Sequence, residues 1–261
     1  PSPPPLAPAP PAPARAVDTP LRPRLEMVCA SSAASGARYR SAFGFSRAAT
    51  DWRQLVSDPQ VDAIVIASPQ ETPRAIAEAA FALGKPVFCE KPLGATLADA
   101  EAMVAAAEAA GVANMIGFNY VRTPATRFAR DLVAEGRIGE VTWFRGEHTE
   151  DFYADPAAAA SWRTEGHPNG TMGDLSPHMI NCARAIMGPI TEVMAEIETV
   201  HSERGDVPVT YDDQARPGGR WVTPMRSTGR RARSASIRRI RMPFGSTPPR
   251  GRRRSGAFAR Y

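Results

Sequence analysis

Hydrophobic positions in the first half of the chain alternate between two spacings. Short apolar runs typical of strands occur at 25–29, 61–67, 86–89 and 112–116, and the run at 61–67 is rich in β-branched residues. The segments between them have apolar residues at helical spacing and predict four helices. The first two are a small-residue helix at about 33–43 and a short helix with Trp52, Leu55 and Val56. The third has Ile76, Ala79, Ala80 and Leu83 inward and stops at Gly84, and the fourth has Leu97, Ala100, Val104 and Ala107 inward. Thr96 and Asp99 have capping-box spacing at the start of this last helix.

This alternation predicts an α/β fold. Strands that alternate with helices over short connections favour right-handed βαβ units and a parallel sheet. The run at 61–67 is nearly continuous in apolar residues, so we expect this strand to be buried on both faces of the sheet.

After Tyr120 the pattern changes and predicts the beginning of an α+β domain. Pro124 opens an expected helix with Phe128, Leu132 and Val133 inward, ended by Gly136. Residues 141–147 alternate apolar and polar positions, as a half-exposed strand does. Beyond an Ala-, Pro- and Gly-rich loop at 155–173 we expect a helix up to Met187 and a strand at 190–200, in which Val193, Ala195 and Ile197 alternate. After Ala215 no apolar periodicity predicts further elements.

Composition narrows the class of protein. The 261 residues are 43% hydrophobic and 23% charged, as in globular proteins, and no apolar run approaches the roughly 20 residues of a spanning helix. The Pro/Ala-rich start lacks the pattern of a secretory signal, and three widely separated cysteines suit a reducing compartment, so we expect a cytoplasmic protein. Residues 216–261 contain fourteen arginines and no acidic residue. Because the whole chain has a net charge of +5, residues 1–215 carry a net charge of −9.

The first candidate site is Glu90-Lys91-Pro92, directly after a predicted strand. The carboxyl ends of strands in a doubly wound sheet face the ligand crevice, where an ammonium can hold a hydroxyl or polarise a carbonyl. A solvated surface ion pair explains the same residues equally well.

The second candidate is Asp174 with His178, four residues apart. This spacing places both on one helix face, and a carboxylate near an imidazole suits general-base chemistry. An alternative is an ordinary hydrogen-bonded pair, with the helix starting at Ser176-Pro177 and Asp174 in the loop outside it. His148, His167 and His201 show no metal-ligand spacing, so we expect no metal site.

A third set is polar and aromatic and would suit a polyhydroxylated ligand, although each member is also explained by a structural role. It comprises Asn119, Tyr120, Arg122, Trp162 and Arg163. The sequence has no G-x-G-x-x-G segment, and Ala30-Ser31-Ser32 stands where an acidic residue would bind the adenosine ribose.

Together, these pieces resemble the Gfo/Idh/MocA family (glucose–fructose oxidoreductase, inositol dehydrogenase, rhizopine catabolism). The matching segments occur in family order over 24–215: 61–69, 84–93, 117–120 with Pro124, 136–141, and Gly173-Asp174 with His178. The resemblance implies a Rossmann domain joined to an α+β domain whose open sheet often mediates homo-oligomers. It also implies NAD- or NADP-dependent hydride transfer with a sugar, inositol or related polyol.

The resemblance also implies roles for individual residues. Lys91 would hold the reacting hydroxyl, His178 would take its proton, and Asp174 would assist. The cofactor would be lined by Ser68, Pro69, Glu90, Lys91, Pro92 and Arg163, and the substrate by Asn119, Tyr120, Arg122 and Trp162. The chain departs from the family pattern at the phosphate-binding glycines and at Gln70, Pro73 and Asn181.

We therefore predict an incomplete Rossmann-type parallel sheet, a truncated α+β domain and disordered ends. The segments are a Pro/Ala-rich leader at 1–23, a dinucleotide-binding domain at 24–120 without its first βα unit, a partial substrate and oligomerisation domain at 121–215, and an Arg-rich tail at 216–261. Two explanations of the ends stay open: either shifts of reading frame in the coding sequence produced both ends, or both ends are genuine disordered extensions.

Two other functions stay open: a sugar-binding or scaffold relative that has lost turnover, and nucleic-acid binding through the arginine tail. The tail lacks the regular aromatic interleaving of a base-stacking surface.

Overall fold

The computed structural model describes residues 23–151, 155, 157–158, 170–205, 207–212 and 214–221. Residues 1–22 of the predicted leader and residues 222–261 of the predicted arginine tail therefore lie outside the described residues. Within the described part, no helix combines the length and the apolar character needed to cross a bilayer.

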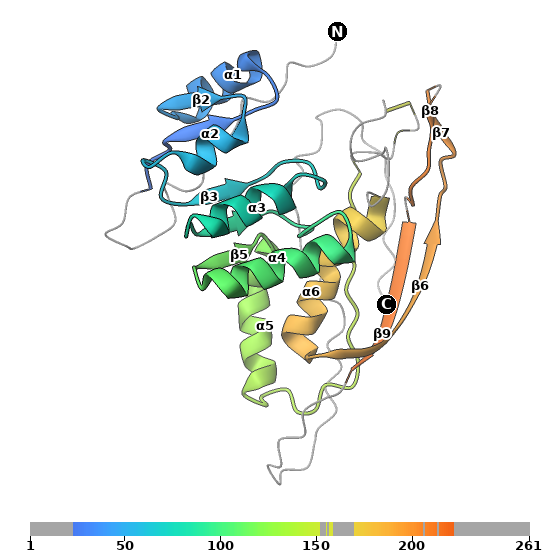
Figure 1. Cartoon of the computed structure of the whole chain (residues 1–261). Helices are drawn as coiled ribbons and strands as arrows, with labels where there is room; N and C mark the ends of the chain where they lie inside the picture. The colour runs from blue at the N-terminus through green and yellow to red at the C-terminus, as the bar shows by residue number, and fades with distance from the viewer. Residues whose placement is uncertain are drawn as a thin grey trace.

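The first half of the described chain is an α/β arrangement of parallel strands, as predicted (Figure 1). One sheet pairs β1 (Met27–Cys29) with β2 (Arg47–Ala49), and a second has the order β3 (Ile64–Ile66), β4 (Val87–Cys89), β5 (Asn114–Ile116). The helices between them are α1 (Ala33–Phe43), α2 (Trp52–Ser57), α3 (Pro73–Ala82) and α4 (Leu97–Ala110). Within the described residues, no strand pairing joins the two sheets.

Local sequence signals set the helix ends. Thr96 caps the helix as predicted, because its Oγ1 accepts from the Asp99 backbone N–H at 3.1 Å. The Asp99 carboxylate accepts from the Thr96 hydroxyl at 2.7 Å, which is a different contact from the backbone one of a full capping box. Helix α4 then ends at Gly111, whose φ of 63° is the left-handed conformation that favours glycine. These contacts stabilise the helix from residues close in sequence, which explains why its bounds were predictable.

The core lies between the three-stranded sheet and helices α3 and α4, which cover the same face in Figure 1. Ile64 and Ile66 point into this core, whereas Val65 is 71% exposed. Val65 aligns with Phe88 and Met115 across the three strands. The prediction of a strand buried on both faces was therefore wrong: a strand alternates its faces with period two, and here helices cover one of them.

Some helix orientations also differ from the prediction. Leu83, Leu97, Val104 and Phe128 are exposed, although all four were expected to face inward. In α4 the buried positions are Met103 and Ala107, so the face that packs is rotated from the predicted one by about one residue. Alanine-rich helices offer several weakly apolar faces, and contact with the sheet selects one.

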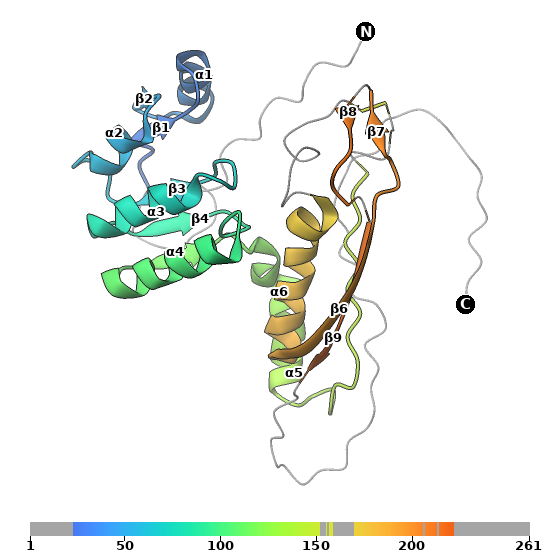
Figure 2. The same cartoon turned by 45° about the vertical axis from the view of Figure 1, so that its right-hand side comes forward.

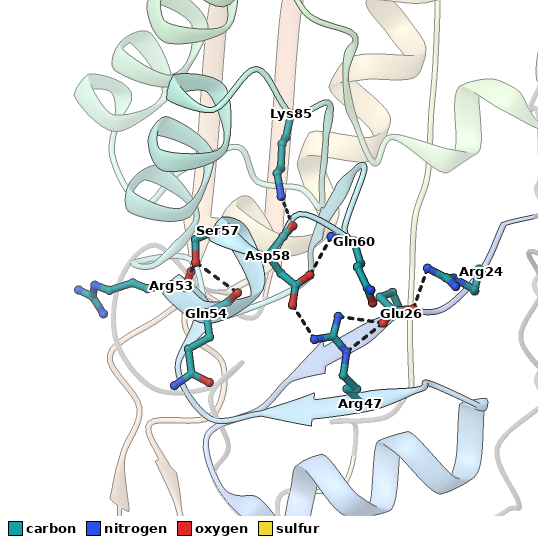
Figure 3. Close-up of polar contacts among 9 residues, drawn as sticks. All are labelled: Arg24, Glu26, Arg47, Arg53, Gln54, Ser57, Asp58, Gln60 and Lys85. Atoms are coloured by element: carbon teal, nitrogen blue, oxygen red, sulfur yellow. Dashed lines mark hydrogen bonds and ion pairs between the residues drawn. The ribbon is translucent and has the colours of Figure 1, made fainter.

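A polar network connects the β1–β2 unit to the rest of the domain at the amino ends of the strands (Figure 3). The Arg47 guanidinium bridges Glu26 (2.8 Å) and Asp58 (2.6 Å), Arg24 pairs with Glu26, and Lys85 Nζ donates to the Asp58 carbonyl at 2.6 Å. The hydrogen bond from Arg47 lowers the pKa of Asp58. Because this network lies at the amino ends, it is structural and separate from the carboxyl edge of the sheet.

The second half packs helices against an antiparallel sheet (Figure 2). The elements are η2 (Asn119–Arg122), α5 (Pro124–Ala134), η3 (Thr171–Leu175), α6 (Ser176–Met187), β6 (Ile190–Glu198), β7 (Glu203–Arg204), β8 (Val207–Pro208) and β9 (Gln214–Trp221). Strand β6 pairs with β9, and α6 lies between α5 and these strands.

Two predictions for this half were wrong. Residues 141–147 form no strand, because no neighbouring strand in the described part of the chain hydrogen-bonds to them. The sheet also continues beyond Ala215, since β9 extends to Trp221. Its pairing with β6 forms through backbone hydrogen bonds, which require no apolar periodicity. A cavity of about 910 Å³ lies between the extended segment 143–150, helix α6 and the β6–β9 pair.

Candidate active site

The candidate site forms where β3, β4 and β5 end at one edge of their sheet. The backbone ladder continues past the strands, because Glu90 N–H donates to the Ile66 carbonyl and Gly117 N–H donates to the Cys89 carbonyl, both at 2.8 Å. Glu90-Lys91 and the segment after Gly117 therefore emerge side by side. This is the edge at which parallel sheets bind ligands.

Lys91 connects this edge to the second half of the chain. Its Nζ donates to the backbone carbonyl of Asp174 at 2.8 Å and also contacts the Asp174 carboxylate. Each side chain is only 13% exposed, so the ion pair is largely shielded from water. The interpretation of Lys91 as part of a solvated surface pair with Glu90 does not fit this geometry. The structure thus brings together residues that the sequence placed in two separate clusters.

Asp174 and His178 are placed by consecutive helical segments. Asp174 lies in η3, a π-helical turn, and α6 begins at Ser176 with Pro177 in its first turn. The alternative helix start at Ser176-Pro177 is therefore the one observed. His178 follows in the first turn of α6 and is only 6% exposed. Its Nδ1 is buried and makes no hydrogen bond to any residue that the structure describes.

Aromatic rings surround the His178 imidazole. Tyr120 lies closest, with ring centroids 4.1 Å apart, while Phe118 and His148 lie at 6.1 Å and 5.9 Å. Burial, followed by the nearby Lys91 ammonium and His148, lowers the pKa of His178 to about 4, and the Asp174 carboxylate opposes this shift. His178 is consequently neutral near pH 7 and has a nitrogen lone pair available to accept a proton.

His148 was not singled out in the sequence analysis except as a histidine without metal-ligand spacing. Its Nε2 lies 2.9 Å from Glu150 Oε1, and its ring lies 5.4 Å from that of Tyr120. The His-x-Glu spacing is the signal that could have identified the pair, since residues two apart in an extended chain share a side. The sequence analysis also predicted that the protein has no metal centre. Among the described residues, His, Cys, Asp and Glu side chains form no cluster that could hold a metal ion.

Two family models match most of the chain. The family model described as "Oxidoreductase family, NAD-binding Rossmann fold" matches residues 12–118, and the "GFO/IDH/MocA C-terminal domain" model matches residues 126–216. The chain belongs to the Gfo/Idh/MocA family.

Individual relatives within the family are dehydrogenases and reductases of sugars and polyols. Levoglucosan dehydrogenase of Pseudarthrobacter phenanthrenivorans is 38% identical over 164 residues, which are 62% of this chain and 42% of that protein. The scyllo-inositol 2-dehydrogenase (NAD(+)) of Bacillus subtilis is 29% identical, over 64% of this chain and 47% of that protein. The chain therefore spans about half the length of the curated relatives it matches.

Solved structures of the family superpose on the described fold. Levoglucosan dehydrogenase in complex with NADH and L-sorbose gives a TM-score of 0.74 at 34% identity, covering 76% of this chain and 55% of that chain. An oxidoreductase domain protein from Kribbella flavida gives the same TM-score at 39% identity, covering 78% of this chain and 56% of that chain. These matches confirm the predicted α/β, Rossmann-type fold.

The carboxyl edge brings the Glu90 side chain close to the backbone that follows β5. A Cβ on Gly117 would lie 2.8 Å from Glu90 Oε1, so glycine is needed for the Glu90 side chain to lie against the backbone after β5. The phosphate-binding end is different, because the chain departs there from the family's glycine pattern.

The other predicted residues are less closely assembled. Ser68 hydrogen-bonds Thr72 at 2.6 Å, and the Pro69 carbonyl accepts from the same threonine, so both are placed at the start of α3. Asn119 and Arg122 lie on η2, and both are exposed. Trp162 and Arg163 lie outside the described residues, so their predicted roles stay predictions.

Proposed function

We propose that this chain supplies the catalytic residues of an NAD(P)-dependent dehydrogenase that acts on the CH–OH group of a sugar, inositol or related polyol. The observation that carries the proposal is the shielded contact between Lys91 and Asp174, formed one helical turn from the neutral imidazole of His178. A cation, a carboxylate and an unprotonated base in one place are what oxidation of an alcohol requires. The names of the family relatives support the substrate class.

The proposed roles follow from the charges of the three groups. The Lys91 ammonium binds the alcohol oxygen and stabilises the negative charge that develops on it. His178 takes the hydroxyl proton, and the C=O bond forms as the C–H bond breaks. A bound nicotinamide supplies the acceptor for the hydride and its electron pair. Asp174 holds the Lys91 ammonium in place, and its negative charge favours the imidazolium that forms.

The most direct test is turnover measured at 340 nm. Full-length protein would be incubated with NAD or NADP and a panel that includes levoglucosan, scyllo-inositol and other polyols. We expect absorbance to rise with at least one substrate, and kcat/KM to fall by roughly 10²- to 10⁴-fold in His178→Gln. Lys91→Ala should also lose activity.

The matched control is Lys85→Ala, which removes the chain's other lysine and should leave activity unchanged, because Lys85 lies at the amino ends of the strands. Equal effects of the Lys85 and Lys91 substitutions would contradict the proposed role of Lys91.

A second candidate function is favoured by the departure from the family's phosphate-binding pattern. In this case the chain binds a sugar or polyol without turnover, as a scaffold or sensor. Ligand binding would be measurable by calorimetry, with no change at 340 nm, and Lys91→Ala would leave that binding largely intact. Titration of the chain with NADH, followed by fluorescence, separates the two candidates: micromolar affinity favours the dehydrogenase. Assembly into homo-oligomers stays a prediction in both cases.

A further inference from the structure

A second imidazole lies beside the proposed catalytic histidine and has no part in the mechanism above. His148 comes from the extended segment that precedes η3, and its side chain is only 4% exposed. Its ring centroid lies 5.9 Å from that of His178 and 5.4 Å from that of Tyr120. Segments far apart in sequence therefore place three rings in one cluster.

Glu150 determines how the His148 ring is held. An ionised carboxylate only accepts hydrogen bonds, so the 2.9 Å contact between Glu150 Oε1 and His148 Nε2 places a hydrogen on Nε2. The carboxylate thereby fixes the tautomer and the plane of the ring. Glu150 is more exposed than His148, with 28% of its side chain accessible. The pair is built with its charged end toward solvent and its ring toward the cluster.

The Tyr120 ring transmits this placement to His178. His148 meets Tyr120 at an interplanar angle of 67°, an edge-to-face contact, and Tyr120 lies against His178 with ring centroids 4.1 Å apart. Burial, followed by the charges of Glu150 and Asp174, raises the pKa of Tyr120, which keeps it a neutral phenol. Tyr120 is consequently a spacer between the two imidazoles.

We propose that Glu150 and His148 act as a positioning pair for His178, holding Tyr120 against the His178 ring. The inference rests on the proposed function in one respect, namely that His178 is the acid–base group. His148 itself is assigned no contact with substrate. Its effect is to keep the neighbouring base in place among the buried rings.

The other groups around His178 act on it from different elements. The Lys91 ammonium follows β4 and disfavours protonation, whereas the Asp174 carboxylate in η3 favours it. Tyr120 lies on η2, and Cys182 one turn further along α6 is a neutral thiol, because burial raises its pKa to about 11. Lys91 and Asp174 are bound to one another, so their opposing effects partly cancel.

Histidine NMR on the full-length protein tests the pair without requiring turnover. The pKa of His178 would be followed on ¹⁵N-labelled histidine, with His178→Gln used for assignment. In His148→Gln, whose amide can still donate to Glu150, the edge-to-face contact with Tyr120 is lost and the ring cluster loosens around His178. Because burial is the main cause of the lowered pKa of His178, we expect that pKa to rise toward its ordinary value of 6.5. His201→Gln removes a histidine in the turn after β6 and is the matched control, which should leave the titration of His178 unchanged.

Glu150→Gln provides a second, more exposed change that tests the other half of the pair. A glutamine side chain can donate or accept, so we expect the ¹⁵N shifts of His148 to change from one tautomer to a mixture. An unchanged His178 titration in His148→Gln, or an unchanged His148 tautomer in Glu150→Gln, would overturn the proposal. Absence of NADH-linked turnover in the wild type, together with these NMR changes, would refute the proposed function and leave the pair intact.

Discussion

Burial of His178 predicts that the stability of this protein depends on pH through this one residue. The pKa of His178 is lowered from 6.5 to about 4, chiefly by burial, and the side chain is only 6% exposed. In the unfolded chain the imidazole regains its ordinary pKa. Between these two values the unfolded state binds more protons than the folded state, so stability increases with pH across this window.

The size of the effect follows from the two pKa values. Stability from this group is complete above pH 6.5 and is lost as pH falls toward 4. Lowering the pH from 7 to 5 should therefore reduce the free energy of unfolding by about 2 kcal/mol through His178 alone. Other titrating groups, such as Asp58 in the network at the amino ends, contribute equally to the wild type and to a His178 variant.

The assay is urea unfolding, followed by circular dichroism, of the wild type and His178→Gln at pH 7 and pH 5. Glutamine has similar volume and does not titrate, so the variant should lose about 2 kcal/mol less than the wild type over this interval. His201→Gln is the control and should behave as the wild type. The same pH dependence in wild type and His178→Gln would refute the reasoning, because it would show that His178 is protonated equally in both states.

Three further predictions concern the fold and the sheet edge. Ile64→Ala should lower the free energy of unfolding, measured in urea, by about 2–5 kcal/mol, because Ile64 points into the core. Val65→Ala next to it should lower the same free energy by under about 0.5 kcal/mol, because Val65 is exposed. Thr96→Ala should cost about 1 kcal/mol in the same assay through loss of the helix cap, and a variant as stable as wild type would contradict the cap. Gly117→Ala should displace the Glu90 carboxylate, which a crystal structure of the variant would show. A fluorescence titration should then show weaker NADH binding. The melting temperature should change little, since the flexible Glu90 side chain can move.

The sequence alone determined the elements whose signals are local. The helix expected at about 33–43 is α1, and the cap at Thr96 places the start of α4, because side chains and backbone within a few residues satisfy the helix ends. The order of strands and helices likewise indicated the parallel sheets, and with them the position of Lys91 at a carboxyl edge. These features depend on backbone geometry that each segment carries by itself.

Tertiary structure decided which of those residues meet. Val65 and Phe128 are exposed and residues 141–147 form no strand, because burial and strand pairing depend on which neighbours are present. The contact of Lys91 with Asp174 and the contact of His148 with Tyr120 each join segments far apart along the chain. No local pattern encodes such a distance. It is set when α6 packs beside the carboxyl edge of the sheet, and the burial this produces is also what makes His178 a neutral base.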